Sequence, residues 1–183
     1  MPRTEITLEP VTRLTAGAIG KPGKRVFFLQ AADADQSITL GIEKIQLQSL
    51  VVGISRFLDE VAEKYPQMAT PEVLPDDSEM RLRTPLDVLF HAGDLGLAYD
   101  AERDWACLIA KEQVFEDIEK DQDNMQKGAV ARLWCTRPQL RAFAVWGAMV
   151  VAAGRPLCPQ CQQPMEPEGH FCPKKNGHKK PAA

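Results

Sequence analysis

A faint internal repeat runs through most of the chain and limits the folds that it can adopt. Residues 16–20 (AGAIG) recur as residues 92–96 (AGDLG), and each copy is followed by a turn and an apolar segment that contains an arginine. Further along, residues 37–42 and 129–134 each lead into the start of an amphipathic pattern. The same order of segments in both halves predicts two structural units of the same kind.

Each half is expected to form three strands followed by one helix, because segments of period 2 give way to a period of 3.6 at corresponding points. An apolar stripe from Leu47 to Val61 predicts the first helix, which Tyr65 should end. Thr136 is the expected N-cap of the second. Consecutive hairpins favour antiparallel pairing. The predicted fold class is therefore α+β: a two-layer, internally duplicated β-β-β-α structure with two helices on one face of an antiparallel sheet.

These patterns divide the chain into two regions. Residues 1–154 are predicted to form the duplicated α+β domain, with repeats at about 12–65 and 86–154, and residues 155–183 a separate tail. Residues 66–85 are rich in proline and acidic side chains, which favours an irregular connector between the halves. No apolar run approaches the roughly 18 residues that a spanning helix needs, so no membrane span is expected.

The tail contains the most specific chemical motif of the chain. Two residues separate Cys158 from Cys161, and His170 and Cys172 follow closely. A Cys-x2-Cys pair lets both thiolates reach one ion from a tight turn, and three sulfurs with one imidazole complete a tetrahedral Zn²⁺ site. Four protein ligands leave zinc no open position for a substrate. The motif therefore predicts a zinc knuckle in which Zn²⁺ has a structural role.

Other interpretations of these cysteines stay open. His178 competes with His170 for the fourth position, although the shorter loop to His170 costs less chain entropy. Cys158 and Cys161 also have the spacing of a redox pair, and a motif of this kind can occur without a metal. A disulfide framework fits least well, because the chain has an odd number of cysteines and no N-terminal signal segment. We therefore expect a reducing, cytoplasmic location.

Charge gives little support for nucleic-acid binding. The formal net charge is -3, so no general attraction to phosphate is expected. Four lysines cluster in the tail, but Phe171 is the only aromatic residue beyond position 156 and offers a single stacking platform. Binding of RNA or single strands through the knuckle is therefore a second alternative to the main interpretation.

His91 is the only histidine outside the tail and is the candidate for a polar or catalytic site. It alternates with Gly93 and Leu95 in a segment typical of a strand, which favours a structural role in the sheet over a general-base role. No catalytic residue is assigned. The sequence favours a function other than catalysis.

A basic, glycine-rich loop is a candidate anion-binding site. It contains Lys21, Lys24 and Arg25, and Arg103 occupies the place of Arg25 in the second half. Pro22 and the strand expected after the loop depart from the P-loop pattern. A proline-glycine pair also favours a simple hairpin turn. Binding of a small phosphorylated ligand at these four basic residues is an alternative to be tested.

Several segments together carry a resemblance to a known family. They are residues 16–20, 23–31, 93–100, 103–104, 152–156, 158–161, 169–173 and 176–177. In these segments the chain resembles the DUF3090 family, a group of uncharacterised proteins of Actinobacteria and Chloroflexi. In the family pattern the place of His178 is more often aromatic, which favours His170 as the ligand. Genes for such proteins tend to occur with those for a lipid-kinase-like protein and a histidine phosphatase, which implies a shared pathway without naming an activity.

The sequence thus predicts an uncharacterised cytoplasmic zinc-binding protein that acts as an interaction or regulatory partner of another protein. The first alternative is a small enzyme or a sensor for a phosphorylated metabolite. That alternative predicts a concave pocket lined by Arg25, His91 and Arg103, whereas an adaptor should present an exposed apolar patch instead.

Overall fold

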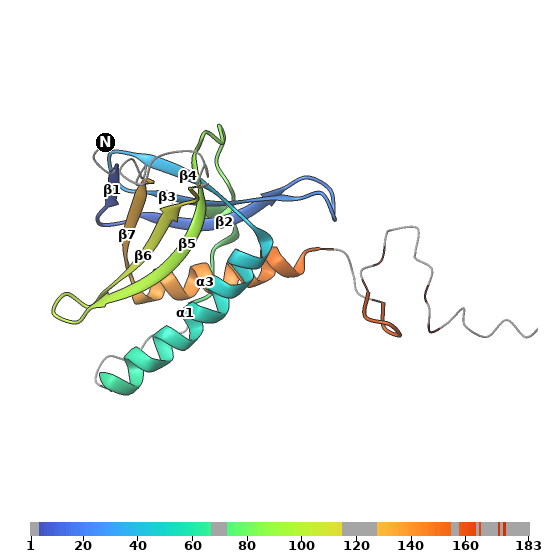
Figure 1. The fold of residues 1–183 in the computed structure, drawn as a ribbon. Helices are drawn as coiled ribbons and strands as arrows, with labels where there is room; N and C mark the ends of the chain where they lie inside the picture. Colours follow the sequence, from blue (N-terminus) through green and yellow to red (C-terminus); the bar gives the residue numbers. More distant parts are fainter. Residues whose placement is uncertain are drawn as a thin grey trace, which may run out of the picture.

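The computed structural model describes residues 4–66, 73–114, 128–154 and 158–163, together with Met165, Cys172 and Lys174. Within these residues the fold is mixed α+β, with one seven-stranded sheet and three helices (Figure 1). In chain order the elements are β1 (Glu5–Leu8), β2 (Arg13–Ile19), β3 (Val26–Ala32), β4 (Ser37–Ile42), α1 (Lys44–Lys64), α2 (Asp77–Met80), β5 (Val88–Asp100), β6 (Trp105–Glu112), β7 (Val130–Thr136) and α3 (Arg137–Ala152).

The strand order in the sheet is β1-β7-β6-β5-β4-β3-β2. Strands β2, β3 and β4 pair antiparallel, as do β5, β6 and β7, but β4 with β5 and β1 with β7 are parallel. The prediction of an antiparallel sheet is therefore wrong for two pairs. Helix α1 and the connector after it carry the chain back before β5 begins, and a crossover of that length permits parallel pairing. Strand β1 was not predicted.

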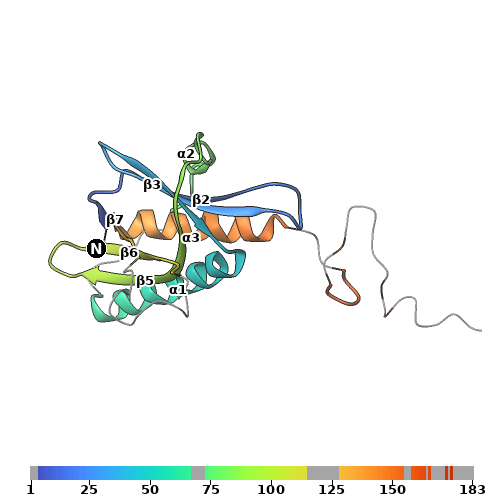
Figure 2. The same cartoon turned by 45° about the horizontal axis from the view of Figure 1, so that its top comes forward.

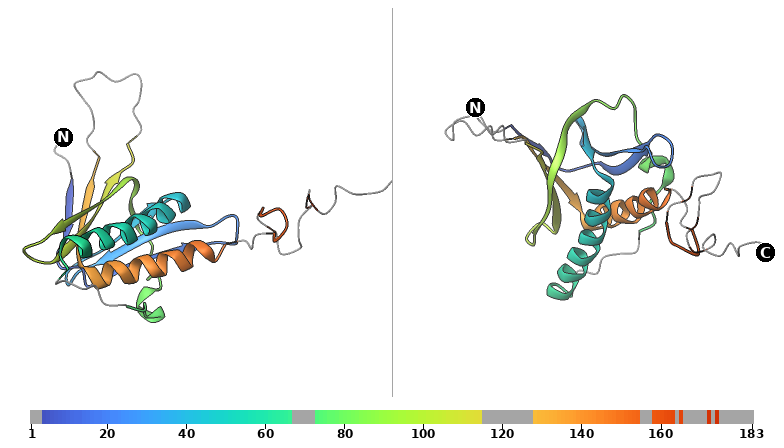
Figure 3. Two further views of the ribbon diagram at one scale, coloured as in Figure 1. Left: turned by 90° about the horizontal axis from the view of Figure 1, so that it is seen from below. Right: turned by 45° about the vertical axis from the view of Figure 1, so that its right-hand side comes forward.

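The order β-β-β-α occurs twice, from β2 to α1 and from β5 to α3, with α2 between the two units. Helices α1 and α3 lie side by side against one face of the sheet (Figures 2 and 3). Gly147 allows their close approach, because a Cβ at this position would lie 2.9 Å from Cγ2 of Val51. The core fills the space between these helices and the sheet, and its fully buried residues include Leu29, Leu47 and Phe143.

A short irregular segment, residues 76–83, lies against the sheet from the other side, and we call it the strap. Buried polar side chains of β2 and β3 hold its backbone. Arg13 Nε donates to the carbonyl of Glu79 at 2.7 Å, and Thr15 Oγ1 donates to that of Met80. Gln30 binds Arg83 twice, accepting from its N–H at 2.9 Å and donating to its carbonyl at 2.8 Å. The described part of the connector is thus irregular apart from the single turn of α2.

Both long helices begin with capping boxes, in which an N-cap side chain and the third helical residue satisfy each other's backbone N–H groups. At α3, Gln139 N–H donates to Thr136 Oγ1 at 3.3 Å, and Thr136 N–H donates to Gln139 Oε1 at 2.9 Å. The predicted N-cap at Thr136 is therefore confirmed.

Thr136→Ala is expected to lower the free energy of unfolding by about 1 kcal/mol, because it leaves an N–H of the first turn of α3 without its acceptor. Urea denaturation at neutral pH would measure this. Ser55→Ala is the matched control, since Ser55 sits within α1 and its hydroxyl only donates back to the carbonyl of Val51. Equal midpoints for Thr136→Ala and the unaltered protein would contradict the assigned cap.

Candidate metal centre

A tight turn after α3 brings the first two tail cysteines together. The N–H of Gln162 donates to the carbonyl of Cys158 at 2.8 Å, and the N–H of Cys158 donates to the carbonyl of Gln163, also at 2.8 Å. Gln162 adopts a φ of 59°, which lets the chain reverse. The backbone of residues 158–163 thus closes on itself and carries Cys158 and Cys161 at one end of the turn.

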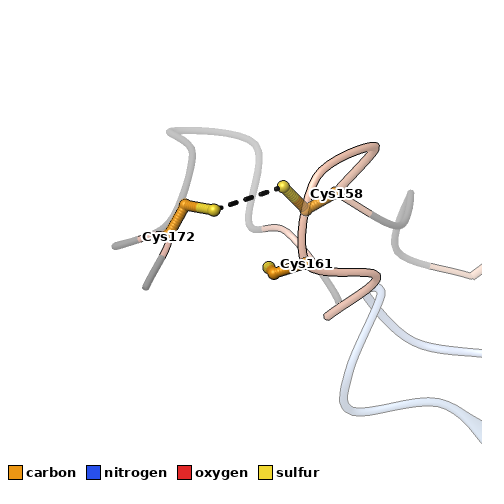
Figure 4. A group of neighbouring side chains, drawn as sticks. All are labelled: Cys158, Cys161 and Cys172. Carbon is orange, nitrogen blue, oxygen red and sulfur yellow. Dashed lines mark hydrogen bonds between the residues drawn. The ribbon is translucent and has the colours of Figure 1, made fainter. Parts of the chain in front are cut away.

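Cys172 brings the third sulfur to the same point (Figure 4). The Sγ atoms of Cys158, Cys161 and Cys172 all lie within 4.8 Å of one another, and those of Cys158 and Cys172 are 3.8 Å apart. Zinc–sulfur bonds of about 2.3 Å at a tetrahedral angle place two sulfurs roughly 3.8 Å apart. The three cysteines could therefore bind one metal ion, and the spacing of Cys158 and Cys172 matches that of two zinc-bound sulfurs.

The backbone around the turn favours the thiolate at Cys158. Hydrogen bonds from the backbone N–H groups of Cys161 and Gln160 lower the pKa of Cys158 to about 7, although burial opposes them. For Cys161, the backbone N–H of Gln163 lowers the pKa, but burial and hydrogen bonds with the other two sulfurs outweigh it and raise the pKa overall. The turn thus stabilises one thiolate ahead of its neighbours, and a bound cation would stabilise the others.

The fourth predicted ligand, His170, lies outside the described residues, and so does its competitor His178. The structure therefore brings together three of the four residues predicted to bind metal. The two remaining cysteines differ from these three. Cys107 and Cys135 are buried within β6 and β7, and burial raises the pKa of Cys135 to about 12, as expected for an unreactive thiol.

Comparison with known proteins identifies the family. The sequence model of the family described as "Protein of unknown function (DUF3090)" matches residues 6–172. The chain belongs to the DUF3090 family. No curated protein and no solved structure matches the chain. The match extends from β1 to Cys172, so it takes in all three clustered cysteines together with the sheet and both long helices.

In this DUF3090 protein the basic glycine-rich loop is the hairpin turn between β2 and β3. The N–H of Lys24 donates to the carbonyl of Lys21 at 2.9 Å, and Gly20 and Gly23 have φ values of 111° and 90°. Both glycines are thus required by the backbone of the turn. Arg25 reaches the end of α3, where Nη1 donates to the carbonyl of Val150 at 2.9 Å.

Arg103 is bound in a different place, at the turn between β5 and β6. Its guanidinium lies 4.5 Å from the ring centre of Trp105 and 5.3 Å from that of Trp134, and it forms an ion pair with Glu9. The two hairpins lie at opposite ends of the sheet (Figure 1). The structure therefore does not bring Arg25 and Arg103 together, and anion binding by the Lys21, Lys24 and Arg25 hairpin stays a prediction.

His91 is an exposed residue of β5, and its ring lies over Gly41 of β4, where a Cβ would come within 2.3 Å of Nδ1. Gly41 is thus needed to accommodate the imidazole. His91 is paired in register with Gly41, and both residues lie on the sheet face away from the helices. Arg25, in contrast, binds the end of α3. These residues do not line one pocket with Arg103, so the geometry gives the enzyme or sensor alternative no shared site.

One hollow that the described residues form lies elsewhere. It has a volume of about 370 Å³ and lies between α1 and β5. Its lining includes three glycines, Gly53, Gly93 and Gly96, of which only the last two belong to the repeated motif. Sequence reasoning missed this groove, because only the tertiary structure brings Gly53 opposite β5. Among the helices described, none is long and apolar enough to cross a membrane.

Proposed function

We propose that this DUF3090 protein binds one structural Zn²⁺ through Cys158, Cys161, Cys172 and His170, and that it acts in the cytoplasm as an interaction or regulatory partner of another protein. The observation that carries the proposal is the convergence of three Sγ atoms within 4.8 Å. An all-protein ligand set leaves no coordination position for a substrate, which favours docking over chemistry at the metal.

The ion would cross-link the turn of residues 158–163 to Cys172. A segment this short cannot bury enough apolar surface to hold one conformation unaided, so binding of a metal ion supplies the free energy of ordering. The ordered knuckle would then present the basic tail residues to a protein partner. The lipid-kinase-like protein and the histidine phosphatase implied by the family resemblance are candidates for that partner.

We further propose that the body is a two-layer domain that arose by duplication of a β-β-β-α unit. The recurring element order supports this, as does the placement of both long helices on one side of the sheet. The two units lie side by side, with the last strand of the first parallel to the first strand of the second.

Cys158→Ser is expected to abolish zinc retention while the body stays folded, because it removes one of three converging sulfurs and leaves the sheet unchanged. The metal content of protein purified without added zinc, measured by inductively coupled plasma mass spectrometry, would test this. We expect one zinc per chain in the unaltered protein and almost none in the variant, with unchanged circular dichroism from the body.

Cys107→Ala is the matched control, since Cys107 is buried in β6 and should not affect zinc content. Freshly reduced wild-type protein without zinc would refute the metal site. Full retention of zinc by Cys158→Ser would show that other residues hold the ion.

A further inference from the structure

The groove between α1 and β5 forms where β5 stops pairing with β4 and continues with β6 alone. Strand β5 pairs with β4 only from Val88 to His91, and from Ala92 to Asp100 it pairs with β6 alone. Beyond His91 the edge of β5 that faced β4 is therefore left without a strand. Helix α1 runs beside this edge (Figures 1 and 2), and the groove lies between them.

At the start of the groove, one side chain of α1 donates the hydrogen bonds that a neighbouring strand would otherwise give to β5. Gln46 Nε2 donates to the carbonyl of Ala92 at 2.9 Å and to that of Gly93 at 2.7 Å. The same amide group accepts from the N–H of Glu43 at 2.7 Å, which fixes its orientation. Past Gly93 no strand of the described chain takes over this role, so residues 94–97 present a free edge to the groove.

At the outer edges of the sheet, one strand is short and the other is partly covered. Strand β1 has only four residues, and short edge strands limit unwanted pairing. On β2 the carbonyl of Ala16 accepts a hydrogen bond of 2.8 Å from Nε1 of Trp146 in α3.

At two positions of the groove, no steric contact explains why the residue is glycine. A Cβ at Gly53 or at Gly96 would meet no atom within 4 Å, and neither residue has a positive φ. Glycine inside a helix or a strand is less stable than alanine or a β-branched residue. The other described glycines all face a close neighbour or have positive φ: Gly17, Gly20, Gly23, Gly41, Gly93, Gly128, Gly147 and Gly154. A strand glycine often marks a bulge, a bend or the close approach of another backbone or a ligand, and the register shift of β5 lies between Ala92 and Leu95, before Gly96.

The residues that line the groove indicate which kind of ligand it could bind. Ile45 is 66% exposed at one end, and the partly buried Leu95 and Leu97 add apolar surface. Asp94 is the only charged side chain of the lining, and within the described residues it makes no ion pair. A free strand edge offers backbone donors and acceptors at the spacing of another strand. The charge complement of Asp94 is a basic side chain.

We propose that this groove binds an extended segment of a partner protein, which adds to the free edge of β5 as a strand, packs apolar side chains against Ile45 and Leu97, and places a basic side chain near Asp94. Gly53 and Gly96 leave room for the backbone of the bound segment. The proposal does not depend on the zinc knuckle, because every residue that it uses lies in α1 or β5.

Selection of a displayed library of random heptapeptides on the zinc-loaded full-length protein would test this. We expect enrichment of sequences in which apolar residues alternate and at least one lysine or arginine occurs. A Cβ at Gly53 meets no atom within 4 Å, so Gly53→Trp can direct its ring into the groove, and it should weaken binding of a selected peptide by about tenfold or more. Gly53→Ala is the matched control and should retain binding while raising the melting temperature.

Amide chemical shifts would locate the peptide, with the largest changes expected at residues 94–97. Equal affinity for Gly53→Trp and Gly53→Ala, with both variants folded, would overturn the proposal. So would a library that yields no enriched sequence, or selected peptides that leave the amides of residues 94–97 unshifted. A dimer of the unaltered protein that Gly53→Trp abolishes would assign the groove to a second copy and would likewise overturn it.

Discussion

Arg13→Ala should lower the free energy of unfolding by about 3 kcal/mol, because it leaves two carbonyl groups of the strap, which Arg13 binds in part-buried hydrogen bonds, without their donor. Arg13 is only 7% exposed and donates to the carbonyls of Glu79 and Arg81. Burial is the main cause that lowers the pKa of this guanidinium. Removing the charge relieves part of that desolvation, so the net effect is smaller than the summed value of the lost hydrogen bonds.

Urea denaturation of the full chain would measure this loss. Arg83→Ala is the matched control, since Arg83 belongs to the same strap and its side chain forms an ion pair with Glu79 in which both side chains are about two-thirds exposed. An exposed pair of this kind contributes little, so the control should change stability by less than about 0.5 kcal/mol. Similar losses in both variants would show that Arg13 does not anchor the strap.

The strap shows why part of the fold could not be predicted. Arg13, Thr15 and Gln30 lie in strands at positions that alternate with apolar residues, and this pattern normally indicates a face open to water. In the structure all three are buried, because a segment more than fifty residues further along the chain lies across them. Local periodicity records which side chains are polar, but it carries no information on a distant segment that covers them.

Features set by neighbouring residues were predictable. The start of α3 follows from Thr136 and the proline in its first turn, and the convergence of Cys158 and Cys161 follows from the length of one turn. Pairings between distant segments were not. The parallel pairing of β4 with β5 depends on the path of a long crossover. Arg25 and Arg103 occupy equivalent places in the two repeats, but these places lie in different hairpins, so the two side chains do not share a site.

A half-buried ion pair at the start of α3 should give the second large effect that we predict. Arg137 is 5% exposed and donates two hydrogen bonds to Asp104, from Nε at 2.6 Å and from Nη2 at 2.9 Å. Tyr99 donates a third at 2.6 Å from its hydroxyl. The network joins the turn between β5 and β6 to the first residue of α3 and so couples the sheet to the helix layer.

Arg137→Met should lower the free energy of unfolding by about 2 kcal/mol. Breaking a fully buried pair costs about 3–5 kcal/mol, but the Asp104 side chain is 42% exposed, so water compensates part of the loss. Arg141→Met, one turn further along α3, is the matched control. Its guanidinium lies 3.7 Å from a largely exposed Asp59, and its removal should change stability by less than about 0.5 kcal/mol. Equal effects in the two variants would contradict the assigned network.

The pH dependence separates this electrostatic contribution from lost packing. Hydrogen bonds from Arg137 are the main cause that lowers the pKa of Asp104 below its ordinary value of 3.8. A depressed carboxyl pKa stabilises the folded state above the unfolded-state value and loses this effect as the pH falls through the folded value. The stability difference between the unaltered protein and Arg137→Met should therefore be constant near neutral pH and shrink below about pH 4. A difference that persists unchanged in acid would assign the effect to the packing of the arginine side chain.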